Sequence, residues 1–202
     1  DLTNQLFFNF ADLKPGDVGE DTISLHVNSN DAWACMAINL TATLENGQTE
    51  PELAVPDTTI GTNEGELQNE LKFVFWNDDG DNVYEVGESA FWLNQTIGQI
   101  SAAGTVALAD SSGNGVLGAT PLVGNSTRYI GKAWCFGDMT LNPVAQDGQG
   151  KTEENGPLAR GTGITCSGAL ATNITQTDGI VADVSFRAEQ SRNNTGFRCT
   201  PV

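Results

Sequence analysis

Apolar and polar residues alternate along much of this chain with a period of two, which is the pattern of half-buried β-strands. Residues 180–189 place apolar side chains at every second position, and the other face carries Asp183, Ser185, Arg187 and Glu189. Residues 36–44 and 23–27 show the same alternation. Residues 71–76 are apolar on both faces, which indicates a central strand covered on both sides.

Shorter segments complete the pattern. Residues 128–136 form a further strand candidate, and residues 104–109 and 165–175 are shorter ones. The sequence Lys-Pro-Gly-Asp at 14–17 is typical of a type II turn. A helical turn or two is expected only in residues 91–100. Many short strands with turns between them predict an all-β sandwich or barrel in one domain.

Two segments stand apart from this pattern. Residues 137–163 are polar and rich in glycine, which predicts a long insertion loop between two cysteines. Residues 1–10 are apolar and strand-forming, with Leu2, Leu6, Phe8 and Phe10 on one face. This strand pairs either within its own domain or with the sheet of a neighbouring subunit, as a donor strand. Head-to-tail repetition of the second contact would give a homopolymer of identical subunits.

The charge balance narrows the choice of partners. The chain carries 26 acidic and 9 basic residues, a formal charge of −17, which argues against nucleic acid and anionic membrane partners. No apolar run reaches the roughly 18 residues of a transmembrane helix. The chain starts at Asp1 with polar residues and without a signal-peptide pattern, as expected of a mature secreted protein or a cytosolic one.

Cysteines and glycosylation sequons favour secretion. The four cysteines are widely spaced and form no C-x-x-C pair, so two disulfides are expected in place of a zinc site. Three connectivities are open, and we favour Cys35 with Cys199 and Cys135 with Cys166; free thiols in a cytosolic core are the alternative. N-linked glycans have five acceptor sequons, at Asn39, Asn94, Asn125, Asn173 and Asn193.

The acidic segment 77–88, N-D-D-G-D-N-V-Y-E-V-G-E, has the ligand spacing of a calcium loop. Oxygen-bearing side chains stand at loop positions 1, 3, 5, 9 and 12, and position 7 offers a backbone carbonyl. Position 6 holds Asn82, a residue that tolerates positive φ, where glycine is expected. We therefore expect a structural calcium ion here, with a solvated acidic loop as the alternative. The predicted ligands are Asn77, Asp79, Asp81, Val83, Glu85 and Glu88.

Catalytic chemistry is not expected. His26 is the only histidine, it lies in an alternating strand, and the chain has no H-E-x-x-H motif. The four tryptophans lie in or beside apolar strand segments, which favours core packing over a sugar-stacking platform; they are Trp33, Trp76, Trp92 and Trp134.

Several segments together resemble the TasA/camelysin family of secreted matrix-fibre proteins and the related archaeal bundling pilins. They include D-L-K-P-G-D and N-D-A-W-A-C in the first part of the chain and G-K-A-W-C-F-G in the second; the segments are 12–17, 30–35, 73–88, 131–137 and 176–199. The resemblance covers nearly the whole length. Family members often carry a longer stretch before the segment that corresponds to L-F-F-N-F at residues 6–10. The donor strand is therefore short if the chain begins at Asp1, and otherwise the donor lies in residues that precede Asp1.

The resemblance implies a jelly-roll-like β-sandwich over residues 11–202 with long loops, and an N-terminal donor strand at 1–10. It also implies polymerisation by donor-strand exchange into extracellular fibres of a biofilm matrix or pilus. Some camelysin relatives are described as proteases, but no recognisable metal-ligand cluster supports that activity in this sequence. The alternatives are a monomeric, calcium-dependent carbohydrate-binding surface module and a secreted hydrolase.

Overall fold

The computed structural model describes residues 13–55 and 57–200. Nine strands run through this part of the chain: β1 Val18–Val27, β2 Ala32–Leu44, β3 Leu71–Asp78, β4 Ala90–Thr96, β5 Val106–Ala109, β6 Ser126–Phe136, β7 Asp138–Leu141, β8 Ile164–Ser167 and β9 Gly179–Gln190. The helices are short: α1 Glu50–Leu53, α2 Leu67–Glu70, α3 Ile97–Ala103, α4 Pro157–Arg160 and the 3-10 turns η1 Asn173–Thr175 and η2 Ser191–Asn193. The candidate donor strand, residues 1–10, lies outside the described residues.

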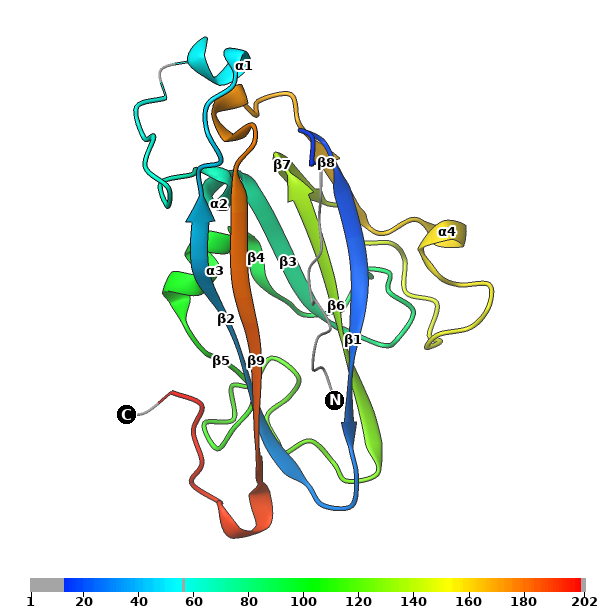
Figure 1. Cartoon of the computed structure of the whole chain (residues 1–202). Helices are drawn as coiled ribbons and strands as arrows, with labels where there is room; N and C mark the ends of the chain where they lie inside the picture. Colours follow the sequence, from blue (N-terminus) through cyan, green and yellow to red (C-terminus); the bar gives the residue numbers. More distant parts are fainter. Residues whose placement is uncertain (1–12, 56, 201–202) are drawn as a thin grey trace.

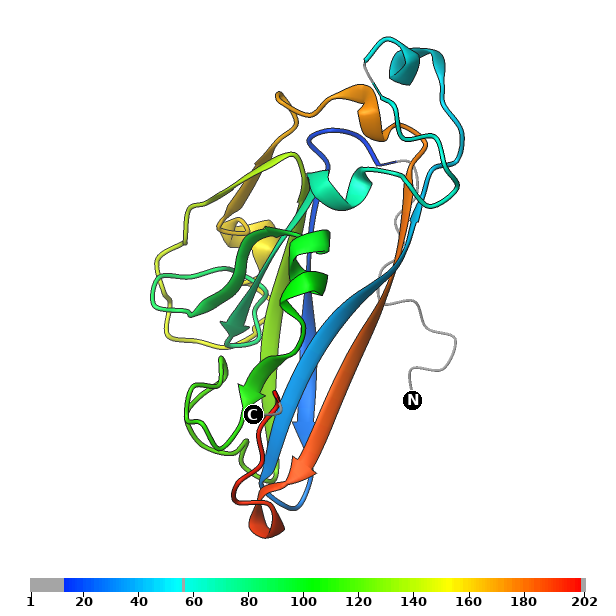
Figure 2. The ribbon, with the colours of Figure 1, turned by 90° about the vertical axis from the view of Figure 1, so that its left-hand side faces the viewer.

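The strands form a β-sandwich. One sheet has the order β1-β6-β3-β4, the other has the order β5-β2-β9, and β7 and β8 make a separate pair (Figures 1 and 2). Every pairing between these strands is antiparallel. Consecutive strands β1 and β2 lie in different sheets, and β6 lies between β1 and β3, as in jelly-roll-like connectivity. The predicted all-β sandwich is confirmed.

The apolar strand β3 is buried on both faces because it contributes to two cores. Phe73 and Phe75 face the core between the two sheets, where they meet residues such as Met36 of β2. Val74 and Trp76 face a second cluster beneath the β7–β8 pair. All four of these β3 side chains are at most 1% exposed.

The two disulfides join the pairs favoured from the sequence. Cys35 of β2 bonds to Cys199 near the end of the described chain, and Cys135 of β6 bonds to Cys166 of β8, each with a Cα–Cα distance of 5.5 Å. Two disulfides indicate an oxidising compartment. No helix among the described residues is long and apolar enough to cross a membrane.

The turn at 14–17 is also confirmed, since the Asp17 N–H donates to the Lys14 carbonyl at 2.9 Å and Gly16 has φ of +95°.

Three sequence predictions need correction. Residues 137–163 are not all loop, because β7 buries Met139 beside β8 and α4 closes the segment. The strand expected at 165–175 ends at Ser167 and is followed by the turn η1. Residues 91–100 divide between β4 and α3; β4 is irregular because Trp92 and Asn94 have positive φ, which breaks its alternation.

Candidate functional site

Asp78, the last residue of β3, shapes the acidic loop that follows. Its Oδ2 accepts hydrogen bonds from the N–H groups of Gly80 at 3.1 Å and Asn82 at 3.3 Å. Its Oδ1 accepts one from the Trp76 indole at 2.9 Å. Asn82 has φ of +65°, so asparagine adopts the left-handed conformation expected at loop position 6.

Glu88 closes the loop from its other end. Its two carboxylate oxygens accept hydrogen bonds from the N–H groups of Asp79 at 3.1 Å and Glu85 at 2.9 Å. Burial, together with the neighbouring carboxylates, raises the pKa of Glu88 to about 8, and burial raises the pKa of Asp78 to about 6. The loop therefore holds several carboxylates whose charged forms are disfavoured, and a bound cation would stabilise those forms.

The structure gathers two overlapping groups of carboxylates around Asp79. One contains Asp78, Asp79 and Glu88, and the other contains Asp79, Glu85 and Asp147, each with ligand atoms within 4.8 Å of one another. Asp79 Oδ1 and Glu85 Oε2 are buried and accept no hydrogen bond from the residues that the structure describes. Burial, then the charges of Glu85 and Asp147, raise the pKa of Asp79. Unpartnered carboxylate oxygens of this kind fit a hard divalent cation.

Arg160 of α4 supplies a positive charge to the same loop. Its Nη1 lies 2.9 Å from Asp81, 2.5 Å from Glu85 and 3.1 Å from Asp147. The second oxygen of Asp81 accepts a hydrogen bond from the Val83 N–H at 2.9 Å. Both oxygens of Asp81 are therefore already engaged, and Arg160 links Asp81 to Glu85 and Asp147.

The predicted ligand set is thus only partly assembled. Asp79, Glu85 and Glu88 belong to the carboxylate groups, and Asp81 pairs with Arg160. Asn77 lies within β3, and Val83 is fully buried. Sequence reasoning missed Asp78, Asp147 and Arg160. Asp147 and Arg160 stand 62 residues from Glu85 and 79 from Asp81, so no local spacing could reveal them.

An open depression of about 530 Å³ adjoins this loop. It is lined mostly by polar residues of the loop, β6 and the segment after β7: Asn77, Asp78, Asp79, Val86, Gly87, Glu88, Ser89, Thr127, Arg128, Tyr129 and Gln146. No tryptophan lines it. Trp33, Trp76 and Trp92 are at most 9% exposed, which confirms the prediction that they pack in the core.

In the part of the chain that the structure describes, each sheet ends in a strand with one unpaired edge, β1 in one sheet and β9 in the other. Within the described chain, β1 pairs only with β6, and β9 pairs only with β2, so the outer backbone edge of each has no strand partner (Figure 1). Their core-facing apolar side chains pack on the main core but remain half-buried: Ile23, Leu25 and Val27 of β1, and Ile180, Ala182 and Val184 of β9. These six residues are called the edge rows below.

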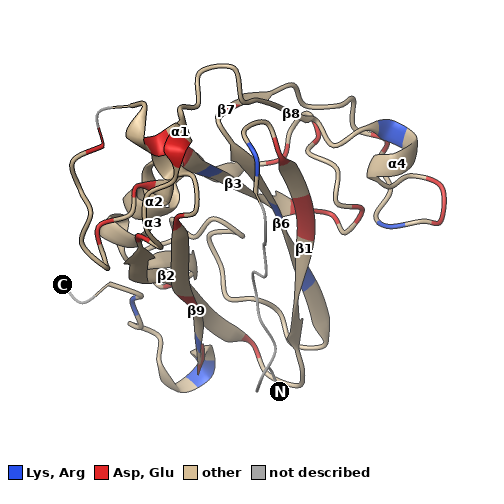
Figure 3. Cartoon of the chain, turned by 45° about the horizontal axis from the view of Figure 1, so that its top comes forward, with Lys and Arg blue, Asp and Glu red and all other residues tan. Residues whose placement is uncertain are grey.

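The surface is acidic and carries the sequons. Figure 3 shows acidic residues spread over strands and loops, with few basic residues between them. All five sequon asparagines are exposed, which leaves their side chains accessible for glycan attachment. The His26 ring contacts the hydroxyls of Ser24 at 3.0 Å and Thr127 at 3.1 Å.

Comparison with known proteins does not place the chain in a family. Neither a scan against protein-family models nor a search of curated proteins found a match.

Proposed function

We propose that this protein is a structural subunit of an extracellular filament, a biofilm matrix fibre or pilus, that polymerises by donor-strand complementation. The observation that carries the proposal is that, among residues 13–55 and 57–200, β1 and β9 each have one edge without a strand partner, beside half-buried edge rows. A strand added to such an edge gains main-chain hydrogen bonds and side-chain contacts together.

The apolar segment 1–10 is the proposed donor. Its alternating residues Leu6, Phe8 and Phe10 would cover the edge rows of the next copy. Each main-chain hydrogen bond contributes about 1 kcal/mol net, and each fully buried large apolar side chain contributes about 1.5–3 kcal/mol. The sum over such a strand makes a joint that opens slowly.

The acidic surface serves the same function. Exposed charges at sheet edges discourage unspecific strand pairing, and a net charge of −17 keeps a long polymer soluble. N-linked glycans on the exposed sequons would add to this effect. The two disulfides suit the extracellular location that we propose.

We also propose a structural calcium ion at the loop after β3, held by Asp79, Glu85 and Asp147. Calcium there would neutralise carboxylates that Arg160 alone does not balance, and it would fix the loop against the segment after β7. An ion surrounded by carboxylate oxygens would stabilise the loop, and its role would be structural.

Truncation tests the filament proposal. Deleting residues 1–10 should abolish fibres seen by negative-stain electron microscopy, and a synthetic 1–10 peptide should bind the truncated protein. Val184→Asp should also block assembly because it places a charge in an edge row. Val181→Asp is the matched control, since Val181 lies on the same strand and is 48% exposed.

Fibres that persist without residues 1–10, or that respond equally to both valine substitutions, would refute the proposal. One observation favours a second candidate, a calcium-dependent carbohydrate-binding module: the polar depression beside the acidic loop. Glycan binding by a protein that remains monomeric at high concentration would support that alternative.

A further inference from the structure

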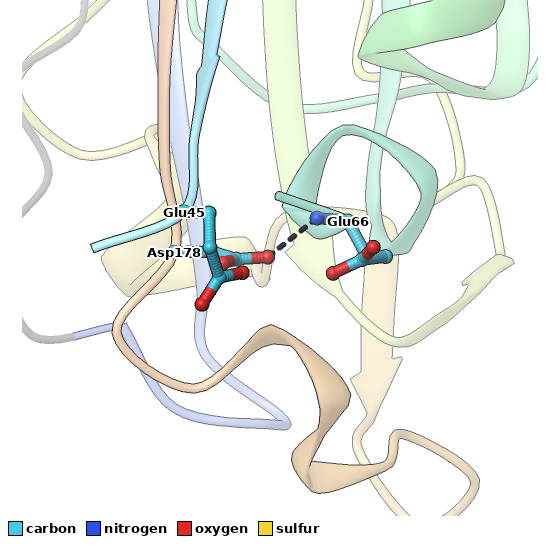
Figure 4. Close-up of side chains that lie close together, drawn as sticks. All are labelled: Glu45, Glu66 and Asp178. Carbon is cyan, nitrogen blue, oxygen red and sulfur yellow. Dashed lines mark hydrogen bonds between the residues drawn. The ribbon is translucent and has the colours of Figure 1, made fainter. Parts of the chain in front are cut away.

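A second group of carboxylates lies at the end of the sandwich where three elements meet (Figure 4). Glu45 follows the last residue of β2, Glu66 caps the start of α2, and Asp178 precedes the first residue of β9. Their ligand oxygens lie within 4.8 Å of one another. None of the three belongs to the acidic loop after β3.

Glu45 is the informative member of this group. It is only 7% exposed, and within the described chain neither of its carboxylate oxygens accepts a hydrogen bond from an N–H or hydroxyl group; its neighbour is the Asp178 carboxyl. Among the described residues, no lysine or arginine forms an ion pair with Glu45, Glu66 or Asp178. A buried carboxylate without a partner is costly, so this arrangement calls for a positive charge.

The other two carboxylates each leave one oxygen free. Asp178 Oδ2 accepts hydrogen bonds from the N–H groups of Glu66 at 2.5 Å and Leu67 at 3.1 Å. One oxygen of Glu66 accepts a hydrogen bond from the Thr59 hydroxyl. Asp178 Oδ1 and Glu66 Oε2 are buried and unpartnered. These side chains are thus held in place by the backbone and by Thr59, while their second oxygens stay available.

Two neighbours add to the site. Glu52 of α1 is fully buried; its Oε2 accepts from the Thr49 N–H at 2.6 Å, and its Oε1 has no partner. A Cβ on Gly65 would lie 2.9 Å from Asp178 Oδ1, so glycine at this position lets the chain approach the carboxylate closely. The negative charge here is therefore concentrated and enclosed.

We infer that this group is a second divalent-cation site, and that its ligand is calcium, bound by Glu45, Glu66 and Asp178. Calcium takes about 6–8 oxygen ligands at about 2.3–2.6 Å in flexible geometry, from carboxylates and water. The three residues supply four unpartnered oxygens, and water completes the shell. Magnesium, which requires a near-ideal octahedron and sheds water reluctantly, fits a set of crowded carboxylates less well.

The consequence of binding is structural. An ion on these three residues would tie the start of β9, an edge strand, to the end of β2 and to α2. It would also fix the segment between Glu45 and Glu66, which leaves the sandwich and returns to it (Figure 1). The inference does not depend on the filament proposal, because it concerns ion binding by a single copy.

Calcium titration of the whole protein by isothermal calorimetry, after removal of bound metal, tests the inference. Glu45→Gln should remove one calcium equivalent or weaken its binding at least tenfold, and Asp79→Asn should affect only the acidic-loop site. Glu50→Gln is the matched control, because Glu50 is exposed on neighbouring α1. Circular dichroism would establish that each variant is folded.

Thermal unfolding supplies a second test. If Glu45 binds calcium, Glu45→Gln should change the melting temperature in opposite directions without and with calcium, which a residue that does not bind the ion would not do. Without calcium, Glu45→Gln should raise the melting temperature by removing a buried unpartnered charge; with calcium, it should lose most of the wild-type gain. Unchanged stoichiometry and affinity in Glu45→Gln would overturn the inference. In that case, a proton shared between the Glu45 and Asp178 carboxyl groups would explain how these two side chains lie so close together. If Glu45→Gln fails to fold, Glu66→Gln provides the same comparison.

Discussion

Without divalent cations, the free energy of unfolding should fall as the pH rises from about 5 to about 8. Asp78 and Glu88 have pKa values raised to about 6 and about 8 in the folded protein. The folded state therefore holds more protons than the unfolded state in this interval, and stability is present at the acidic end and lost as each group ionises. This direction is opposite to ordinary acid denaturation.

The magnitude follows from the burial of the two groups. A pKa shift of one unit corresponds to about 1.4 kcal/mol. The pKa of Asp78 lies about one unit above pH 5, so its ionisation lowers the free energy of unfolding by about 1.4 kcal/mol. Glu88 titrates over about three units, nominally about 4 kcal/mol, and because it is only half-buried we halve this value for solvent screening to about 2 kcal/mol. These two groups together are therefore expected to contribute a loss of about 3 kcal/mol, and Glu45, whose pKa burial raises to about 7, adds to the loss in the same direction.

Urea unfolding at several pH values in a chelating buffer measures this loss. Glu88→Gln should remove about 2 kcal/mol of this loss, whereas Glu50→Gln, which changes an exposed carboxylate, should leave the loss unchanged. Millimolar calcium should flatten the profile in the wild type, since an ion bound by Asp79 would lie beside Asp78 and Glu88, which group with Asp79, and would stabilise their ionised forms. A profile that rises toward pH 8, or one that Glu88→Gln does not alter, would refute this reading of the loop.

Three further predictions concern the framework. Replacing Cys35 and Cys199 by alanine should lower the free energy of unfolding by about 5 kcal/mol, and replacing Cys135 and Cys166 should lower it by about 3.6 kcal/mol. The difference arises because the disulfides close loops of 164 and 31 residues, and the longer loop loses more entropy in the unfolded chain. Urea unfolding measures both losses, and equal losses would contradict this prediction. Gly131→Ala should lower the free energy of unfolding by about 3 kcal/mol, because a Cβ there would lie 2.0 Å from the buried indole of Trp76. Gly196→Ala is the control and should be neutral in the same assay, because a Cβ there would meet no atom within 4 Å. Protein from a glycosylating secretory host should lose mass on enzymatic deglycosylation, and an unchanged mass would show that the exposed sequons are not used.

The sequence predicted the elements whose pattern is regular. Strand β9 alternates in burial from Ile180 to Val184, and β3 is apolar on both faces because it is covered on both sides, so each was recognisable from its own residues. Near the end of β9 the alternation fails, because Phe186 and Ala188, expected on the inward row, are exposed. Strand β4 was missed because two of its residues have positive φ. Strand β7 was missed because four residues are too few to show a period.

The two acidic sites differ in how far the sequence could predict them. The loop after β3 is local, so spacing alone identified Asp79, Glu85 and Glu88. Its partner Arg160 comes from a distant segment, which explains why sequence spacing assigned Asp81 as a ligand and missed the ion pair. The second group joins residues 45, 66 and 178, and only the folded chain brings them together.

High-resolution electron microscopy of fibres assembled from the purified protein tests the filament proposal most directly. The proposal predicts that residues 1–10 of one copy run along β1 or β9 of the next, with Leu6, Phe8 and Phe10 against its edge rows. Single particles at every concentration, or fibres in which residues 1–10 pack within their own copy, would contradict it.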